Sequence, residues 1–166
     1  MKKIAIVFLI FFSPKLTLAK KNLSAHVHGV VSLDVASDKK QLLVMLNTPS
    51  ESFLGFEYKA RTKAEKDVVL QVKNEWIMGL ISYLGTDVLK DCKVSKSKWE
   101  QHFESKVHSR IEAEAYIDCN NILAGRTLSI TFSSKHKSIN VIHLQLLREN
   151  GTVLSKKFNK DFEVKL

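Results

Sequence analysis

Alternation of apolar and polar residues with a period of two constrains the fold most, because it recurs on both sides of a single helical segment. The first alternating segment covers residues 26–35, and its apolar face consists of Val27, Val31, Leu33 and Val35. Such a pattern predicts a half-buried strand. After a polar stretch around Ser37 and Asp38, residues 41–47 are again apolar, which predicts a hairpin that ends at Pro49.

The second group of alternating segments lies in the last third of the chain. Residues 111–118 alternate, and their polar face consists of Glu112, Glu114, Tyr116 and Asp118. Residues 127–132 and 141–147 are also typical of strands. Asn150-Gly151 predicts a tight turn that leads into a further strand over residues 152–158.

One helical segment separates the two groups. Thr62 and Glu65 have capping-box spacing, Gly85 provides a stop, and the stretch 50–61 is aromatic enough to pack beneath the helix start. Apolar residues recur every four positions at Val68, Val72, Trp76 and Leu80. Together the patterns predict an α+β fold with a mostly antiparallel sheet and one long amphipathic helix of about twenty residues.

The start of the chain resembles a secretory signal peptide. Met1-Lys2-Lys3 is basic, residues 4–12 are an unbroken apolar run, and residues 17–19 place small residues where signal peptidase cuts. The run is much shorter than the ~20 residues of a membrane-spanning helix. We therefore expect a cleaved signal peptide at residues 1–19, a single domain at residues 20–166 and no transmembrane segment in the mature chain.

Composition and charge exclude several classes of protein. With 45% hydrophobic and 26% charged residues, the chain is neither disordered nor collagen-like. Its formal charge is +9, and loss of three lysines and no acid with residues 1–19 leaves +6. Such a surface favours anionic neighbours. An exported protein rarely meets nucleic acid, so we expect no nucleic-acid partner.

Cys92 and Cys119 are the only cysteines of the sequence. Export delivers them to an oxidising compartment, which favours a disulfide. The two alternatives, a thiol pair in a metal site and a redox-active pair, lack the close C-x-x-C spacing that is typical of both. We expect a structural disulfide, which stabilises a loop of this length by roughly 3–4 kcal/mol through the entropy of the unfolded chain.

His26-x-His28-Gly29 is the sharpest chemical motif in the sequence. Residues two apart on a strand share one face and lie about 6.6 Å apart, so both imidazoles can converge on one metal ion. A zinc ion in a protein usually has three or four protein ligands, and neutral imidazole is among its usual donors. The candidate donors that would complete the site are His102 and His108, with Glu112 or Glu114 as additional donors.

Other interpretations of the same residues remain open. A histidine pair near the start of a mature chain is also typical of solvated side chains or of hydrogen bonds to a neighbouring strand. Glu112 and Glu114 by themselves are typical of a solvated strand face. A zinc hydrolase with Glu114 as base would need a catalytic spacing such as H-E-x-x-H, which the sequence lacks. We therefore expect a protein that is not an enzyme.

A series of short motifs covers nearly the whole mature chain. In order, they are Ala25-His26-Val27-His28-Gly29-Val30, Pro49, Leu54-Gly55-Phe56-Glu57, Arg61-Thr62, the two cysteines, Glu114-Ala115-Tyr116 to Cys119, and Leu144-Gln145-Leu146-Leu147 with Gly151. Their order and spacing resemble the ZrgA family of periplasmic zinc-binding proteins. The opening A-H-x-H-G-V element is the most diagnostic part of the resemblance.

The resemblance implies a soluble periplasmic protein of Gram-negative bacteria that binds zinc and assists its uptake or buffers it. It also implies a partner, the binding protein of an ATP-driven zinc importer. It carries over directly to His26 and His28 and to the cysteine pair. Family members typically carry a long run of alternating His and acidic residues between the cysteines, where this chain has only His102, Glu104 and His108. Such a short segment can complete one site but cannot hold several ions.

The shortened segment also keeps an alternative function open, a metal-free envelope interaction module that binds a partner through its basic surface or aromatic loop. In the zinc interpretation, an imidazole with an ordinary pKa of ~6.5 must lose its proton before it coordinates, so binding weakens in acid. Oxidised cysteines would not be ligands. The remaining His and carboxylate donors suit zinc and do not exclude copper or nickel.

Overall fold

The computed structural model describes residues 27–85 and 89–166. They form, in chain order, β1 (Val30–Asp38), β2 (Gln41–Pro49), α1 (Glu51–Leu54), α2 (Lys63–Leu84), β3 (Cys92–Phe103), β4 (Ser109–Cys119), β5 (Thr127–Ile130), α3 (Phe132–Lys135), β6 (Val141–Leu147), β7 (Val153–Phe158) and β8 (Phe162–Lys165). The predicted signal peptide and His26, the first histidine of the H-x-H motif, lie outside the described residues.

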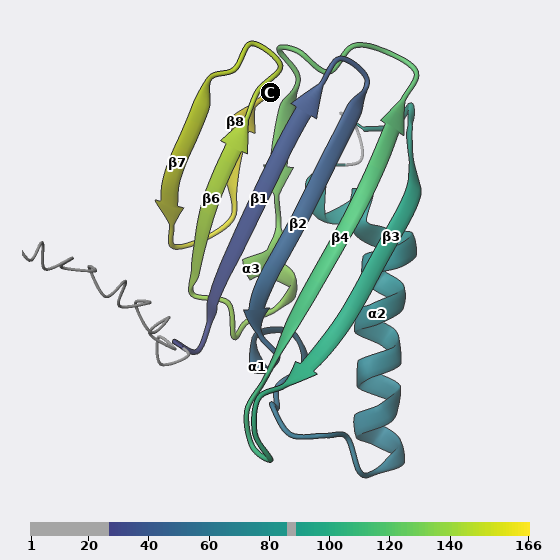
Figure 1. The fold of residues 1–166 in the computed structure, drawn as a ribbon, viewed down its shortest axis with the longest axis vertical. Helices are drawn as coiled ribbons and strands as arrows, with labels where there is room; N and C mark the ends of the chain where they lie inside the picture. The colour runs from purple at the N-terminus through teal and green to yellow at the C-terminus, as the bar shows by residue number, and fades with distance from the viewer. Residues whose placement is uncertain (1–26, 86–88) are drawn as a thin grey trace, which may run out of the picture.

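Six strands form the main sheet, in the order β3-β4-β2-β1-β6-β7 (Figure 1). Neighbouring strands are antiparallel, except that β1 and β6 run parallel. β5 and β8 pair as a separate antiparallel sheet. The structure therefore agrees with the predicted α+β class and its mostly antiparallel sheet, and it adds two four-residue helices, α1 and α3, to the 22-residue helix α2.

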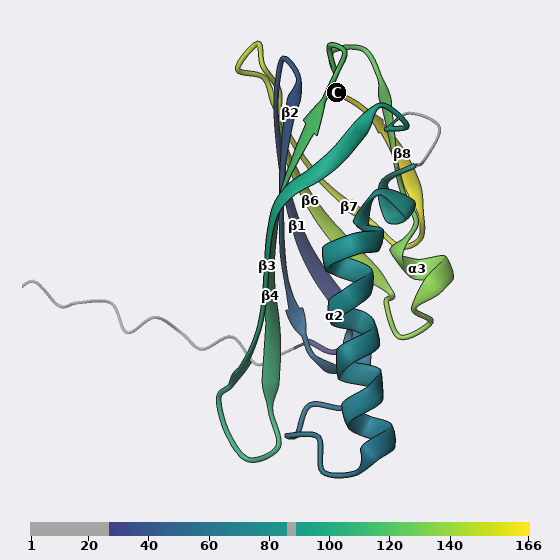
Figure 2. The same ribbon diagram turned by 90° about the vertical axis from the view of Figure 1, so that its right-hand side faces the viewer.

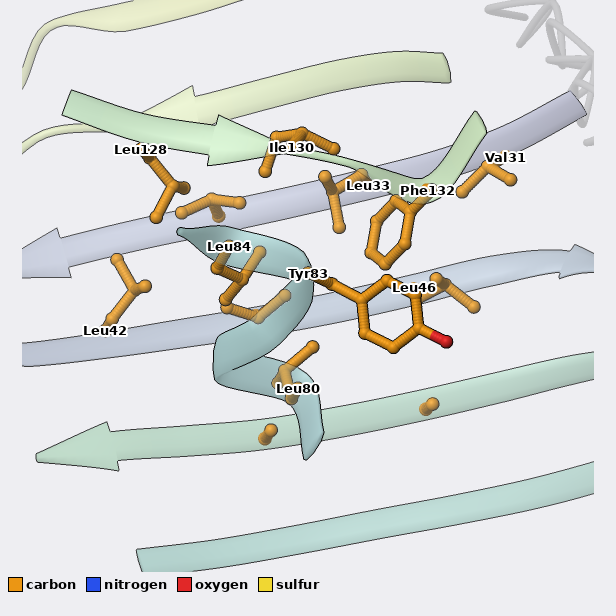
Figure 3. Close-up of a cluster of buried hydrophobic side chains, with 14 of the residues drawn as sticks. Val31, Leu33, Leu42, Leu46, Leu80, Tyr83, Leu84, Leu128, Ile130 and Phe132 are labelled. Atoms are coloured by element: carbon orange, nitrogen blue, oxygen red, sulfur yellow. The ribbon is translucent and has the colours of Figure 1, made fainter. Parts of the chain in front are cut away.

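The apolar core lies between the main sheet and the elements that cover one of its faces. Figure 2 shows α2, α3 and β8 on the same side of the sheet. The apolar side chains of β1 that point toward them, Val31, Leu33 and Val35, are at most 3% exposed. The core that they form together is drawn in Figure 3, and its labelled members are Val31, Leu33, Leu42, Leu46, Leu80, Tyr83, Leu84, Leu128, Ile130 and Phe132.

β1 begins later than the alternation predicts, because a turn precedes it. The turn contains His28 and Gly29. Gly29 has a φ of 74°, and a Cβ at this position would lie 2.5 Å from both the Asn140 side chain and the Ser138 carbonyl oxygen, so only glycine fits. The chain leaves the strand direction here. Val27 is consequently 66% exposed, and its predicted place on the apolar face is wrong.

α2 begins and ends where the sequence predicts. Thr62 Oγ1 accepts a hydrogen bond from the Glu65 N–H, and the Glu65 carboxylate accepts one from the Thr62 N–H, which completes the capping box. Backbone N–H donors, that of Thr62 foremost, lower the pKa of Glu65 to about 2. The helix ends at Gly85, and Trp76 Nε1 donates to the Glu114 carbonyl of β4 at 3.3 Å, which ties the helix to the sheet.

Besides α1, three elements escape the sequence patterns. β3 is an edge strand rich in lysine and serine, so no apolar face marks it. Residues 132–135 form α3, so the predicted strand over residues 127–132 is two residues too long. β8 was not predicted. The expected disulfide is present, since Cys92 and Cys119 face each other across β3 and β4 and are bonded.

Candidate metal centre

Three segments of the chain bring imidazole and carboxylate groups together at one end of the main sheet. His28 lies in the turn before β1, Glu51 is the first residue of α1, and Glu57 lies in the loop after α1. Figure 1 shows α1 at the end of the sheet where β1 starts and where β3 turns into β4. The fold therefore concentrates polar side chains where the apolar core ends.

Two glycines set the backbone on either side of this cluster. The Gly29 carbonyl accepts hydrogen bonds from the N–H groups of Asn140 and Val141 at 2.8 and 3.0 Å, which holds the turn of His28 against the start of β6. Gly55 ends α1 in the left-handed region, with a φ of 80°, and its N–H donates to the Glu51 carbonyl at 2.9 Å. The second turn directs the chain toward Glu57.

His28 contacts both carboxylates. Its Nδ1 contacts Oε2 of Glu51 and lies 3.7 Å from Oε1 of Glu57. One donor atom from each of the three residues lies within 4.8 Å of the other two. Donors that bind one tetrahedral zinc ion at ~2.0–2.1 Å lie ~3.3 Å apart. The separations in this set therefore exceed that spacing by at most about 1.5 Å.

Glu57 differs from the other members because its carboxylate is buried. Its side chain is 6% exposed, compared with 57% for His28 and 41% for Glu51. Oε2 lies 2.6 Å from Nδ1 of His108, whereas Oε1 is buried without a hydrogen-bond partner among the described residues. A buried acceptor without a partner costs about 1–3 kcal/mol, and more when it is charged. A cation beside Oε1 would relieve this cost.

The predicted donors separate into two groups. His28 and His108 meet at Glu57, one at each carboxylate oxygen. Glu114 lies on the outward side of β4, where its hydrogen bond with Tyr116 raises the pKa of that phenol. His26 lies outside the described residues.

His102 lies apart from Glu57 and contacts other carboxylates. Its Nε2 lies 3.4 Å from Glu100 Oε2 and 3.3 Å from Glu112 Oε2. Each carboxylate already has a cationic partner, since Lys98 Nζ lies 2.9 Å from Glu100 and Arg110 Nε lies 2.9 Å from Glu112. Nε2 of His102 is also buried without a hydrogen-bond partner among the described residues, but the carboxylates beside it already have cationic partners, which disfavours coordination there.

Sequence reasoning missed Glu51 and Glu57. Both lie in the aromatic stretch 50–61, which was expected only to pack beneath the start of α2. Phe53 and Phe56 do pack against the core, and the two carboxylates flank them along the chain. The sequence did contain a signal for Glu57, because this residue ends the Leu54-Gly55-Phe56-Glu57 motif of the family resemblance.

One family of known proteins matches most of the chain. The ZrgA family, described as zinc uptake proteins, matches residues 25–164, which include the cluster and both cysteines. No curated protein matches the chain. Among the described residues, no helix has both the length and the apolar character that crossing a bilayer requires. A zinc uptake family and a disulfide both point to a location outside the cytoplasm. The chain therefore belongs to the ZrgA family of zinc uptake proteins.

Proposed function

We propose that this protein binds zinc in the periplasm of Gram-negative bacteria and assists its uptake or buffers it, without catalysing a reaction. The proposed ligands are His28, Glu51 and Glu57, and His26 is the predicted fourth donor. The family match and the mixed imidazole and carboxylate cluster support this role. Nitrogen and oxygen donors of this kind suit zinc.

One observation carries the assignment of the site, and it concerns Glu57. Its buried Oε1 lacks a hydrogen-bond partner among the described residues and faces the half-exposed imidazole of His28. An unpaired carboxylate is costly to bury, unless a cation completes its surroundings. A zinc ion held by His28, Glu51 and Glu57 would give Oε1 a partner and would neutralise both carboxylates.

Zinc is the cargo of such a protein, so the site must release it. His28 and Glu51 are 57% and 41% exposed, which leaves the ion a path from solvent and back. Because an imidazole coordinates only after it loses its proton, binding weakens as the pH falls. We propose that the receiving partner is the binding protein of an ATP-driven zinc importer.

His108 has a different role in this proposal. Its Nδ1 contacts Oε2 of Glu57, so that Oε1, the other oxygen, is directed toward His28. Partners of this kind orient metal ligands and tune their affinity. We therefore propose that His108 positions Glu57 and that His28 is the imidazole ligand.

Isothermal titration of chelator-stripped protein with zinc at neutral pH tests the proposal. The wild type should give a saturable heat for one ion. His28→Ala and Glu57→Gln should each weaken binding at least ~100-fold, since even the outer partners of metal ligands are worth 10–100-fold. His143→Ala, which removes an exposed imidazole from β6, is the matched control and should bind like the wild type. No saturable heat in the wild type rejects the proposal, and unchanged affinity in both ligand variants rejects the assigned site.

Growth under zinc limitation separates this function from the metal-free interaction module. A strain that carries the H28A/E57Q double variant should grow more slowly than one that carries H143A when zinc is scarce. Normal growth of the double variant, together with loss of a partner contact when the basic surface is changed, would favour the module instead.

A further inference from the structure

We propose that Ser109, together with Ser50 and Gln101, is a positioning residue that holds both carboxylates of the candidate metal centre in place. The inference rests on the proposed function, because it concerns the same site. Ser109 is the first residue of β4, and Ser50 immediately precedes Glu51 at the start of α1. The three side chains are called the serine brace below.

Ser109 contacts the main chain of Glu57 and the side chain of Ser50, the residue that precedes Glu51. Its hydroxyl donates to the main-chain carbonyl of Glu57 and lies 2.9 Å from the hydroxyl of Ser50. The Ser50 N–H donates in turn to the Ser109 carbonyl at 2.9 Å. The preceding residue, His108, contacts the Glu57 carboxylate. Ser109 thus holds the main chain of Glu57, and His108, the residue before it, holds the side chain of Glu57.

Gln101 completes the serine brace from the neighbouring strand β3. Its Nε2 donates to Ser109 Oγ at 3.0 Å and to Ser50 Oγ at 3.4 Å. A serine hydroxyl has one proton and can accept two hydrogen bonds. When Ser109 gives its proton to the Glu57 carbonyl, its oxygen can accept from Gln101 and Ser50. Each hydrogen-bond donor of the serine brace then has an acceptor. These hydrogen bonds form together only when the three side chains keep their relative positions.

Burial of polar groups is concentrated at this point of the fold. Among the described residues, six polar or charged side chains are buried, and four of them are Ser50, Ser52, Glu57 and Ser109. Both brace serines are at most 1% exposed. Burying a polar network costs desolvation free energy that an apolar cluster does not lose. When all its hydrogen bonds are satisfied, however, the network fixes one arrangement of its side chains. Here the arrangement that it specifies is the spacing of Glu51 and Glu57.

The expected consequence is a preorganised pair of carboxylates. Without the Ser109 hydroxyl, the Glu57 carbonyl loses its tether to β4, and the Glu57 side chain samples positions farther from His28. Outer partners of metal ligands typically contribute 10–100-fold to metal affinity. We expect Ser109→Ala to weaken zinc binding about tenfold.

Two variants at Ser109 test the inference when each is measured in three ways. S109A should weaken zinc binding in calorimetry and should change the visible absorption spectrum of the protein loaded with Co²⁺, which reports ligand geometry. Ser109→Thr keeps the hydroxyl and should restore both. Gln101→Met, which leaves both serines in place, should weaken zinc binding in the same direction. Thermal unfolding of the metal-free proteins measures stability separately.

Ser37→Ala is the matched control, because it removes a buried hydroxyl of β1 that does not belong to the serine brace. It should leave zinc affinity and the cobalt spectrum unchanged. If S109A lowers only the unfolding temperature, or if S109T loses affinity as S109A does, Ser109 contributes packing alone and the inference is overturned. If S109A does not fold, unchanged affinity and spectrum in Q101M overturn it. Failure of the wild type to bind zinc would instead reject the proposed function.

Discussion

The candidate metal centre and a second group of side chains around Tyr83 each pair a histidine with a glutamate, yet they differ in what lies between the donor atoms. In the candidate metal centre, His28 Nδ1 and Glu57 Oε1 are 3.7 Å apart, and Oε1 has no hydrogen-bond partner among the described residues. In the second group, His136 Nε2 and Glu75 Oε2 are 3.9 Å apart. The hydroxyl of Tyr83 lies 2.9 Å from that imidazole and 2.5 Å from that carboxylate.

The second group is a closed hydrogen-bond network. Gln71 donates to the other oxygen of Glu75 at 2.9 Å, and the ring of Phe53 packs on the His136 imidazole with 4.5 Å between centroids. Burial lowers the pKa of His136, and burial together with the hydrogen bond to Glu75 raises the pKa of Tyr83. Burial opposes ionisation of Glu75, but its hydrogen bonds from Tyr83 and Gln71 outweigh burial and lower its pKa. A neutral imidazole, a protonated phenol and an ionised carboxylate therefore satisfy one another.

The difference teaches that residue types alone do not make a metal site. In the second group, a phenol hydroxyl occupies the position between donors that an ion would take. In the first group, a buried oxygen keeps an unused lone pair beside an exposed imidazole. Buried polar groups in folded proteins normally have partners, so the exception is the better candidate for binding.

The largest expected effect is zinc-dependent stabilisation that depends on Glu57 and not on Glu75. Zinc at ~100 times its Kd should raise the free energy of unfolding of the wild type by ~2.7 kcal/mol. Glu57→Gln should lose nearly all of this gain, whereas Glu75→Gln should keep it. Urea denaturation with and without zinc measures both. If zinc stabilises E57Q as much as the wild type, the two groups do not differ as described.

A second effect, of intermediate size, concerns the hydroxyl between His136 and Glu75. Tyr83→Phe should lower the free energy of unfolding by about 1–2 kcal/mol, because it leaves two polar groups without their shared partner. The zinc-dependent gain should not change. Tyr116→Phe removes the same atom from a tyrosine that is 38% exposed and is expected to stay within about 0.5 kcal/mol of the wild type. Equal stability of Y83F and Y116F would contradict the role given to Tyr83.

A smaller effect is the pH dependence of stability that His136 causes. Burial, with a contribution from Lys135 and against the charge of Glu75, holds the pKa of His136 below its ordinary value of 6.5. The unfolded chain therefore binds this proton more readily, and the free energy of unfolding decreases as the pH falls through about 6.5. Denaturation at pH 7, 6 and 5 should show a smaller decrease for His136→Gln than for the wild type. The prediction fails if both proteins lose stability in parallel.

The smallest effect is expected at His102, whose neighbouring carboxylates already have Lys98 and Arg110 as partners. Exposed charge networks of this kind contribute little. His102→Ala should change zinc affinity less than about threefold, compared with the loss of ~100-fold expected for His28→Ala. Titration of the two variants under the same conditions makes the comparison. A loss in H102A as large as that in H28A would return His102 to the ligand set.

Much of the fold could be predicted because the periodicity of burial is a local property. The alternation of Val31, Leu33 and Val35 marked the buried face of β1, and the capping box with Gly85 marked both ends of α2. β3 was missed for a physical reason. Its residues become a strand by pairing with β4 at the edge of the sheet, and an edge strand carries lysines and serines rather than an apolar face.

The candidate site could be predicted only in part. His28 stood out through the H-x-H-G motif, and His108 stood out as one of the two histidines between the cysteines. Glu57 did not, since a carboxylate in a loop is ordinary until it is buried. Its contact with His108 spans 51 positions of the chain, and no local pattern encodes a separation of that size.

The sequence by itself determined the class of fold, the long helix, the disulfide and the family, because each follows from side-chain periodicity, capping chemistry or short motifs in order. Only the tertiary structure decided which carboxylates meet His28. That choice depends on the placement of β4 beside β2 and β2 beside β1, which brings the starts of β1, α1 and β4 to one end of the sheet. Contacts between distant segments arise from packing of the whole chain, and burial of Glu57 is a product of that packing.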